Sequence, residues 1–169
     1  MCSGRVDLSF VLRGFLKGAD GVCIIGCHLG ECNYVTQGNY HALSMVHLGK
    51  KLLEYIGLNS ERLMIEWCSA SEGARFAEVM AGFSKKLGEI GPLGIAEGIN
   101  GDELKSRLEE AIRFVPLLKL AKKNKLSFRS ENEEDYKKLY SKEEIETFFK
   151  TQRSKAESWW QKYWEKGKR

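Results

Sequence analysis

Residues 21–34 of this chain have the sequence GVCIIGCHLGECNY. The apolar run from Val22 to Ile25 predicts a buried strand. Cys27 and Cys32 follow this run in a loop, with four residues between the two thiols. Ligands of open α/β sheets bind at the carboxyl ends of the strands. The sequence therefore predicts a ligand site in the loop that carries Cys27 and Cys32.

The segments on both sides of this loop predict an α/β fold. Asp7 is expected to cap a helix that ends at Gly18, and Asn39 is expected to cap a second helix. Residues 63–67 predict another strand. The order helix, strand, helix, strand, helix predicts a small parallel sheet flanked by helices, because parallel strands need crossover connections. Two parallel strands are few for a stable sheet, so Cys2 is expected to end a further strand.

Helices are also predicted beyond the second strand. Ser69 and Glu72 have the spacing of a capping box at the start of the next helix. The apolar stripe of that helix, which is expected to pack in the core, consists of Phe76, Met80, Phe83, Leu87 and Ile90. A further amphipathic helix opens near Asp102, and Pro116 is expected to kink or divide it. We therefore expect an α/β domain at residues 1–94 and a helical extension at residues 95–169.

Charge separates these two parts. Residues 1–100 hold nine Lys and Arg against ten Asp and Glu, whereas residues 101–169 hold eighteen against thirteen. The end of this basic part is rich in large aromatic residues, which include Trp159, Trp160, Tyr163 and Trp164. We predict that these aromatic residues dock the chain on a partner subunit, and the alternative is that they cover the core of the same domain. Nucleic-acid binding is the weaker alternative, because the basic residues alternate with acidic ones, and we predict no nucleic-acid partner.

Composition limits the class of protein further. Apolar residues make up 43% of the 169 residues, which is enough for a hydrophobic core, yet no apolar run approaches the roughly 20 residues that span a bilayer. The first residues show no secretory signal, so we expect a cytoplasmic chain without a membrane span. Five cysteines in such a chain favour metal or redox chemistry over a disulfide framework.

The spacing of Cys27 and Cys32 occurs as the first half of the plant-type ferredoxin pattern, but Val35 stands where the third cysteine would be. Zinc sites usually contain a second pair, which is absent. Spacing alone therefore leaves metal binding and ordinary reduced thiols as alternatives. If Cys2 ends a neighbouring strand, however, its thiol lies at the same sheet edge, and three thiols converge.

Other residues of metal-binding type are given simpler interpretations. Cys23 lies in an apolar strand and Cys68 directly follows one, so both are expected to pack as small hydrophobic residues. His28 and His41 are expected to make ordinary hydrogen bonds. No nucleophile elbow or phosphate-binding glycine loop is present, so the sequence does not indicate hydrolysis.

Four segments resemble one known family. They are MCSGRVD at residues 1–7, GCHLGECNY at 26–34, GNY at 38–40 and EWCSASEG at 66–73. They are similar to the delta subunit of methyl-viologen-reducing hydrogenase, over about residues 1–130. The resemblance implies a small iron–sulfur protein of anaerobic metabolism, such as methanogenesis. Such proteins carry a 2Fe-2S cluster and pass electrons from a hydrogenase or formate dehydrogenase to the flavin-containing A subunit of heterodisulfide reductase.

The resemblance also implies which residues bind the cluster. Cys2, Cys27 and Cys32 match the family's cysteine motifs, so residues 1–94 are expected to be an iron–sulfur domain. Family members normally begin with a further strand and a Cys-x-x-Cys-type loop. We therefore expect a separate chain or an upstream segment to supply a strand and at least one more thiolate. The implied role is a non-catalytic electron-transfer subunit of an oxidoreductase complex, and the alternative is a cluster-free adaptor in the same complex.

Overall fold

The computed structural model describes residues 2–34, 38–125, 134–135, 138, 147–151, 153–155 and 158. Among these residues, β1 (Val22–Gly26) and β2 (Leu63–Trp67) form a two-stranded parallel sheet. Val22 pairs with Leu63, and Gly26 pairs with Trp67. Both predicted strands and their parallel arrangement are confirmed.

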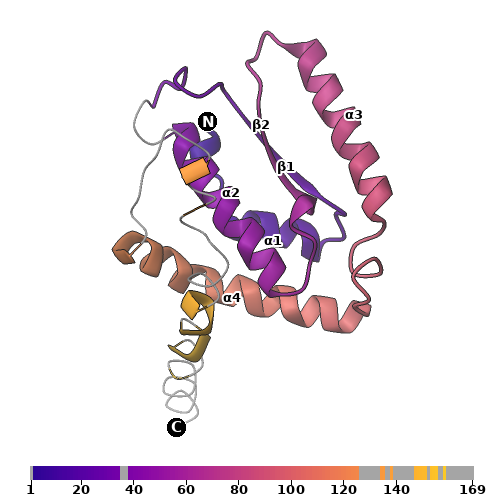
Figure 1. The fold of residues 1–169 in the computed structure, drawn as a ribbon, viewed down its shortest axis with the longest axis vertical. Helices are drawn as coiled ribbons and strands as arrows, with labels where there is room; N and C mark the ends of the chain where they lie inside the picture. The colour runs from indigo at the N-terminus through magenta and orange to yellow at the C-terminus, as the bar shows by residue number, and fades with distance from the viewer. Residues whose placement is uncertain are drawn as a thin grey trace.

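Helices lie on both sides of this sheet (Figure 1). The view in Figure 1 shows α2 (Gly38–Tyr55) on one side of the two strands and α3 (Gly73–Ile90) on the other. α1 (Leu8–Leu16) packs against α2 and α4 (Gly101–Lys125), which crosses the lower end of the molecule. The predicted α/β class, with a helical C-terminal part, is confirmed.

The start of α1 follows from its capping residue. Asp7 Oδ1 accepts a hydrogen bond from the backbone N–H of Ser9 at 2.9 Å, as predicted for an N-cap. Gly18 has a φ of +93°, which a glycine adopts without strain, and it follows the helix end. Lys119 of α4 also contacts the Asp7 carboxylate. Burial raises the pKa of Asp7, but the hydrogen bonds from Lys119 and Ser9 outweigh burial and leave the pKa lowered.

One hydrophobic core joins α1, α2, the sheet and α4. The largest fully buried apolar side chains are Phe15, Phe149, Leu12, Leu43, Leu52, Leu53, Leu63, Leu108 and Leu118. Phe149 is 0% exposed, and its ring centroid lies 5.3 Å from that of Tyr55 in α2. Residues beyond 94 thus contribute to the same core as the sheet, and the division into a domain at residues 1–94 and an extension at residues 95–169 stays a prediction.

Pro116 does not divide the fourth helix. α4 runs from Gly101 to Lys125 with Pro116 inside it, so the expected division is wrong. A proline removes one backbone donor from a helix, and packing can offset that loss. Val115 and Leu118, on either side of Pro116, are buried in the core. Packing of the apolar face therefore continues through the proline.

The apolar stripe of α3 is mostly exposed rather than packed in the core. Phe83 is the buried residue of α3, whereas Phe76 is 48% exposed and Met80 is 37% exposed. These side chains line an open groove of about 520 Å³ together with Cys23 and Ile25 of β1. The expectation that this stripe packs in the core is therefore wrong for Phe76 and Met80.

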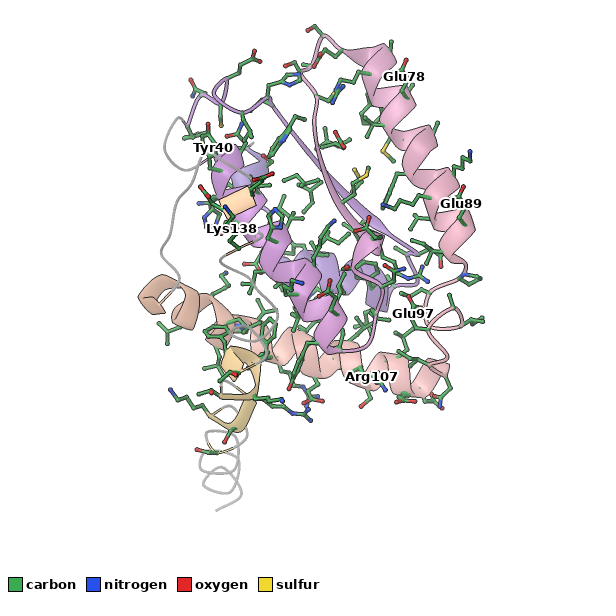
Figure 2. All side chains as sticks on the ribbon, viewed as in Figure 1. Tyr40, Glu78, Glu89, Glu97, Arg107 and Lys138 are labelled. Atoms are coloured by element: carbon green, nitrogen blue, oxygen red, sulfur yellow. The ribbon has the colours of Figure 1, made fainter. Side chains whose placement is uncertain are left out.

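A buried ion pair fixes the connection between α3 and α4. Arg62, which ends η2 (Ser60–Arg62), is 0% exposed, and its Nε donates to Glu97 Oε1 at 2.6 Å. Its Nη2 donates to the backbone carbonyl of Pro92 at 3.2 Å. Figure 2 labels Glu97 in the connection between α3 and α4. A fully buried guanidinium with these partners holds that connection against the start of β2.

Two predictions about the rest of the chain have different outcomes. Within the described residues, no helix is both long enough and apolar enough to cross a membrane. The aromatic residues of the tail, Trp159, Trp160, Tyr163 and Trp164, lie outside the described residues, and so does Val35. The two alternatives for that tail, partner docking and core coverage, stay open.

Candidate metal centre

The structure brings Cys2, Cys27 and Cys32 together. Cys2 precedes η1 (Ser3–Arg5), Cys27 directly follows β1, and Cys32 lies in the loop that leads to α2. The sulfur atoms of Cys2 and Cys32 are 3.6 Å apart, and Cys27 lies close enough to Cys32 for each thiol to shift the pKa of the other. Residues far apart in the sequence thus form one group of three thiols near the carboxyl end of β1.

The distance between two of these sulfurs suits a common metal. Two thiolates on one tetrahedral metal, with bonds of about 2.3 Å, lie about 3.8 Å apart. The observed 3.6 Å between the sulfurs of Cys2 and Cys32 is close to that value. Among the described residues, no three His, Cys, Asp or Glu side chains are arranged as a ready site for a single ion. The spacing of the Cys2 and Cys32 sulfurs is thus compatible with two ligands of one metal.

Backbone N–H groups prepare Cys32 to ionise. Cys32 is 6% exposed, and hydrogen bonds from the N–H of Tyr34 and then of Asn39 lower its pKa against the opposing effect of burial. Burial raises the pKa of Cys27, and the hydrogen bond to Cys32 raises it further. Cys2 accepts a bond from the N–H of Gly4 at 3.4 Å. Since metal ligands are thiolates, the lowered pKa of Cys32 favours its role as a ligand.

Glycine at position 38 makes room for this thiol group. A β-carbon at Gly38 would lie 2.0 Å from the sulfur of Cys32 and 3.2 Å from that of Cys2. α2 begins at Gly38, so its first turn approaches the sulfurs closely. The N-terminal end of a helix carries a partial positive charge, which favours anionic sulfur. Gly38 therefore allows the first turn of α2 to pack closely against the sulfurs of Cys2 and Cys32, where its partial positive charge favours anionic sulfur.

Asn39 does not cap α2 as expected. It lies within the first turn of the helix, which begins at Gly38, and its side chain faces the cysteine loop. Its amide nitrogen donates to the carbonyl oxygens of Cys27 at 2.9 Å and His28 at 2.7 Å. The prediction of an N-cap is therefore wrong, because the side chain binds a loop that lies earlier in the chain.

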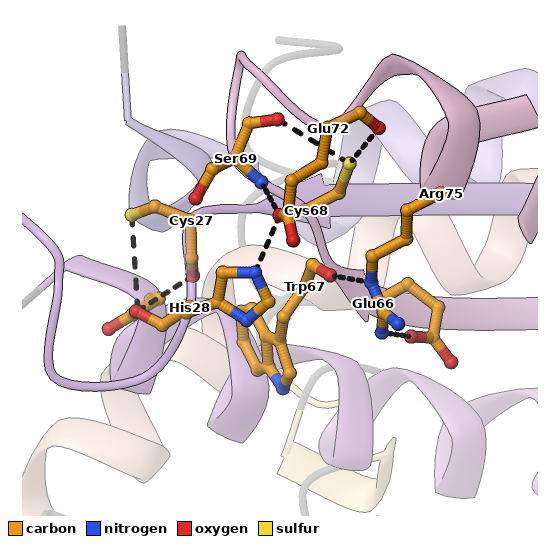
Figure 3. A network of polar contacts seen from close by, with 9 residues as sticks. Cys27, His28, Glu66, Trp67, Cys68, Ser69, Glu72 and Arg75 are labelled. Atoms are coloured by element: carbon orange, nitrogen blue, oxygen red, sulfur yellow. Dashed lines mark hydrogen bonds and ion pairs between the residues drawn. The ribbon is translucent and has the colours of Figure 1, made fainter.

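His28 ties the same loop to the start of α3, as Figure 3 shows. Its Nε2 lies 2.6 Å from Glu72 Oε2, and this oxygen also accepts from the N–H of Ser69 at 2.6 Å. The hydrogen bond from Ser69 lowers the pKa of Glu72, and the bond with His28 lowers it further. Half of the predicted capping box thus forms, although α3 begins only at Gly73. His28 makes a hydrogen bond, as expected.

Cys68 and Cys23 stand apart from the group of three thiols. The thiol of Cys68 contacts the carbonyl oxygens of Ser69 at 3.6 Å and Glu72 at 3.4 Å. Figure 3 shows the sulfurs of Cys68 and Cys27 directed to different sides. Cys23 lines the groove beside α3, where burial and the charge of Glu66 raise its pKa to about 11. The described contacts of these two thiols thus involve other groups than Cys2, Cys27 and Cys32.

Two polar atoms near the thiols have no partner among the described residues. They are the hydroxyl oxygen of Ser3 and the side-chain carbonyl oxygen of Asn39, both buried. Ser3 follows Cys2, and a β-carbon at Gly26 would lie 2.6 Å from that hydroxyl. Sequence analysis did not identify Ser3, Gly38, Asn39 or Glu72 as site residues. The dipeptide of Gly38 and Asn39 directly after the cysteine loop was the available signal.

The fold and these residues define a class: a small α/β protein with a group of thiols near the carboxyl end of a parallel strand. Residues 1–91 match the family model described as methyl-viologen-reducing hydrogenase, delta subunit. The chain belongs to this family. The matched segment is shorter than the expected resemblance over residues 1–130.

Individual relatives agree with this assignment. The chain is 48% identical over 91 residues to a hydrogenase iron–sulfur subunit of Archaeoglobus profundus. These 91 residues are 54% of this chain and 66% of that protein. A similar protein of Methanococcus voltae is 44% identical over 97 residues, with 57% and 67% covered. The A subunit of the heterodisulfide reductase of Methanosarcina mazei is 44% identical over 94 residues, which are 56% of this chain and 12% of that protein. The chain thus matches about two thirds or less of these relatives.

Proposed function

We propose that this chain is an iron–sulfur electron-transfer subunit in which Cys2, Cys27 and Cys32 bind a 2Fe-2S cluster. The observation that carries the proposal is the convergence of three thiols, two of them with sulfurs 3.6 Å apart. The lowered pKa of Cys32 supports it, because cluster ligands are thiolates. The names of the relatives, which include hydrogenase iron–sulfur subunits, also support it.

The remaining residues of the site would bind and orient the ligands. The N–H groups of Tyr34 and Asn39 stabilise negative charge on Cys32, and the N–H of Gly4 donates to the sulfur of Cys2 at 3.4 Å. The hydrogen bond between His28 and Glu72 holds the cysteine loop against α3. When bound, a 2Fe-2S cluster supplies a site that accepts and releases one electron at a time.

A fourth ligand is needed, because 2Fe-2S clusters normally have four protein ligands. Cys68 is engaged with the carbonyls of Ser69 and Glu72, and Cys23 faces the groove beside α3. We therefore propose that the fourth thiolate comes from a separate chain or another segment. This proposal rests on the positions of the two remaining cysteines.

The proposed partners follow from the relatives. One set of relatives is named as hydrogenase iron–sulfur subunits, and another is named as the A subunit of heterodisulfide reductase. We propose that the chain passes electrons between a hydrogenase or formate dehydrogenase and a flavoprotein that resembles this A subunit. In the heterodisulfide reductase relatives, a segment similar to this chain is part of the same polypeptide. Such a covalent link would keep donor and acceptor close.

The test uses the full chain, produced without oxygen together with the proposed flavoprotein partner. Cys27→Ser and Cys32→Ser should each abolish the electron paramagnetic resonance signal of the reduced cluster. Cys68→Ala is the matched control, because its thiol bonds only nearby backbone carbonyls, and it should leave the signal intact. A normal signal in Cys32→Ser would refute the ligand assignment.

An adaptor without a cluster is the second candidate. The exposed apolar residues Phe76 and Met80 of α3 favour it, since exposed apolar surface often marks contacts with partners. Iron analysis separates the two functions. A correctly assembled complex that is colourless and contains no iron attributable to this chain would support the adaptor.

A further inference from the structure

Asn39 is a fully buried polar residue that contacts both cysteines of the loop. Its exposure is 0%, and its amide nitrogen lies 3.9 Å from the sulfur of Cys27, within reach of a long N–H···S contact. Its backbone N–H bonds to Cys32. One residue of α2 thus touches the two thiols from its side chain and its main chain.

The side-chain contacts of Asn39 also fix the backbone of the loop. The amide nitrogen donates to two successive carbonyls, those of Cys27 at 2.9 Å and His28 at 2.7 Å. The direction of a carbonyl is set by the ψ angle of its residue, so two anchored carbonyls restrain two successive peptide groups. The side chain of Cys27 leaves the backbone between these restraints and β1. Its direction toward Cys32 therefore depends on Asn39.

Asn39 carries a buried polar atom without a partner among the described residues, which an apolar residue at this position would not have. Its carbonyl oxygen Oδ1 is buried and has no partner among the described residues. Unpaired buried acceptors are rare in proteins and call for a specific explanation. Departures from local rules of this kind concentrate at functional sites. The amide nitrogen of Asn39, by contrast, contacts three acceptor atoms of the loop. Any stabilising effect of Asn39 therefore comes from its amide nitrogen.

We infer that Asn39 is a positioning residue of the metal centre, which directs the Cys27 sulfur toward Cys32 and raises the reduction potential by donating toward that sulfur. The part that concerns the potential rests on the proposed iron–sulfur function. A donor near a ligand sulfur stabilises the extra negative charge of the reduced state, so its removal makes reduction less favourable. The part that concerns positioning applies to the chain with or without iron.

The experiment compares Asn39→Ala and Asn39→Asp in the full chain with its partner. Asn39→Asp keeps the size of the side chain but replaces the amide donor with an acceptor. It therefore still tests the donor if Asn39→Ala folds poorly. Asn33→Ala and Asn33→Asp are the controls, since Asn33 lies exposed in the same loop. Circular dichroism and thermal unfolding establish that each variant is folded.

Two measurements are made on each protein. The first is the midpoint potential of the cluster, which should become more negative in the Asn39 variants. The shift should be up to about 59 mV for a one-electron couple, which corresponds to about a tenfold change in the equilibrium constant of reduction. The second is the rate at which iodoacetamide alkylates each cysteine in the iron-free chain, followed by peptide mass spectrometry. The alkylation rate of Cys27 should differ severalfold from the wild-type rate in the Asn39 variants, because its sulfur is no longer held toward Cys32, with Cys23 unchanged as an internal reference.

The two measurements separate this inference from the proposed function. If the wild-type complex holds no iron, the electron-transfer function fails, and the alkylation rates alone decide whether Asn39 positions Cys27. Unchanged Cys27 alkylation in both folded Asn39 variants would overturn the positioning role. An unchanged potential in an iron-loaded Asn39 variant would overturn the effect on the sulfur. Equal changes in the Asn33 variants would overturn both, because they would show a general effect of the loop.

Discussion

Replacement of Gly38 by alanine should disrupt the thiol group more than it disturbs the fold. The new methyl carbon would lie 2.0 Å from the sulfur of Cys32, whereas carbon and sulfur atoms in contact need about 3.5–4.0 Å. The sulfur must therefore move by about 1.5 Å or more. Cys32 has one side-chain torsion and is buried, so it can move only by leaving its rotamer or by shifting the loop.

The expected loss of stability follows from two opposing effects. Overpacking of a buried site typically costs about 1–3 kcal/mol. Alanine in place of glycine returns up to about 1 kcal/mol in a helix, and less at the first position of α2. The free energy of unfolding of Gly38→Ala should therefore fall by about 1–2 kcal/mol. Because Cys32 also loses its 3.6 Å contact with Cys2, iron content should fall much further than stability.

Gly73→Ala is the matched control for this change. Gly73 is the first residue of α3 as Gly38 is the first of α2, yet a β-carbon there would meet no atom within 4 Å. Urea denaturation should show Gly73→Ala to be as stable as the wild type or up to about 1 kcal/mol more stable, with normal iron. If Gly38→Ala matched Gly73→Ala in both stability and iron content, the close approach of α2 to the sulfurs would be refuted.

Three further changes test the fold. Arg62→Leu should lower the free energy of unfolding by about 3–5 kcal/mol in urea, because it leaves Glu97 buried without its ion-pair partner. Burial raises the pKa of Glu97, but Arg62 and backbone N–H groups outweigh burial and leave this pKa below 4.5. The wild type should therefore lose the stability that the ion pair contributes as the pH falls below 4.5 through the folded pKa. Glu97→Gln should not show this loss. Phe149→Ala should cost about 3–5 kcal/mol, and a change near zero would contradict its place in the core.

The parts of the fold that could be predicted depend on local interactions. Residues 63–67 form a strand as predicted, because they are apolar and β-prone along most of their length. Asp7 caps α1 because its side chain reaches an N–H only two residues away. Such features involve neighbours in the sequence, so the residue pattern alone is sufficient evidence for them.

Features that depend on distant partners were predicted less well. The stripe of Phe76 and Met80 on α3 is real, but periodicity does not reveal what covers an apolar face. Pro116 was expected to kink or divide its helix, and α4 continues through it undivided because tertiary packing overrides that local preference. The role of Asn39 was missed because a helix-capping residue and a loop-binding residue look alike in sequence. In each case the outcome depends on packing or contacts outside the local segment.

The candidate site lies between these two situations. Cys27 and Cys32 share one loop, so their proximity follows from the sequence. Cys2 lies beside them because η1, which follows it, packs against α2. The first residue of α2 is Gly38, which has no side chain that would hold the sulfurs apart. The absence of a β-carbon at one position thus determines whether the three thiols converge. Sequence analysis that considers only cysteines would miss Gly38, the residue on which their arrangement depends.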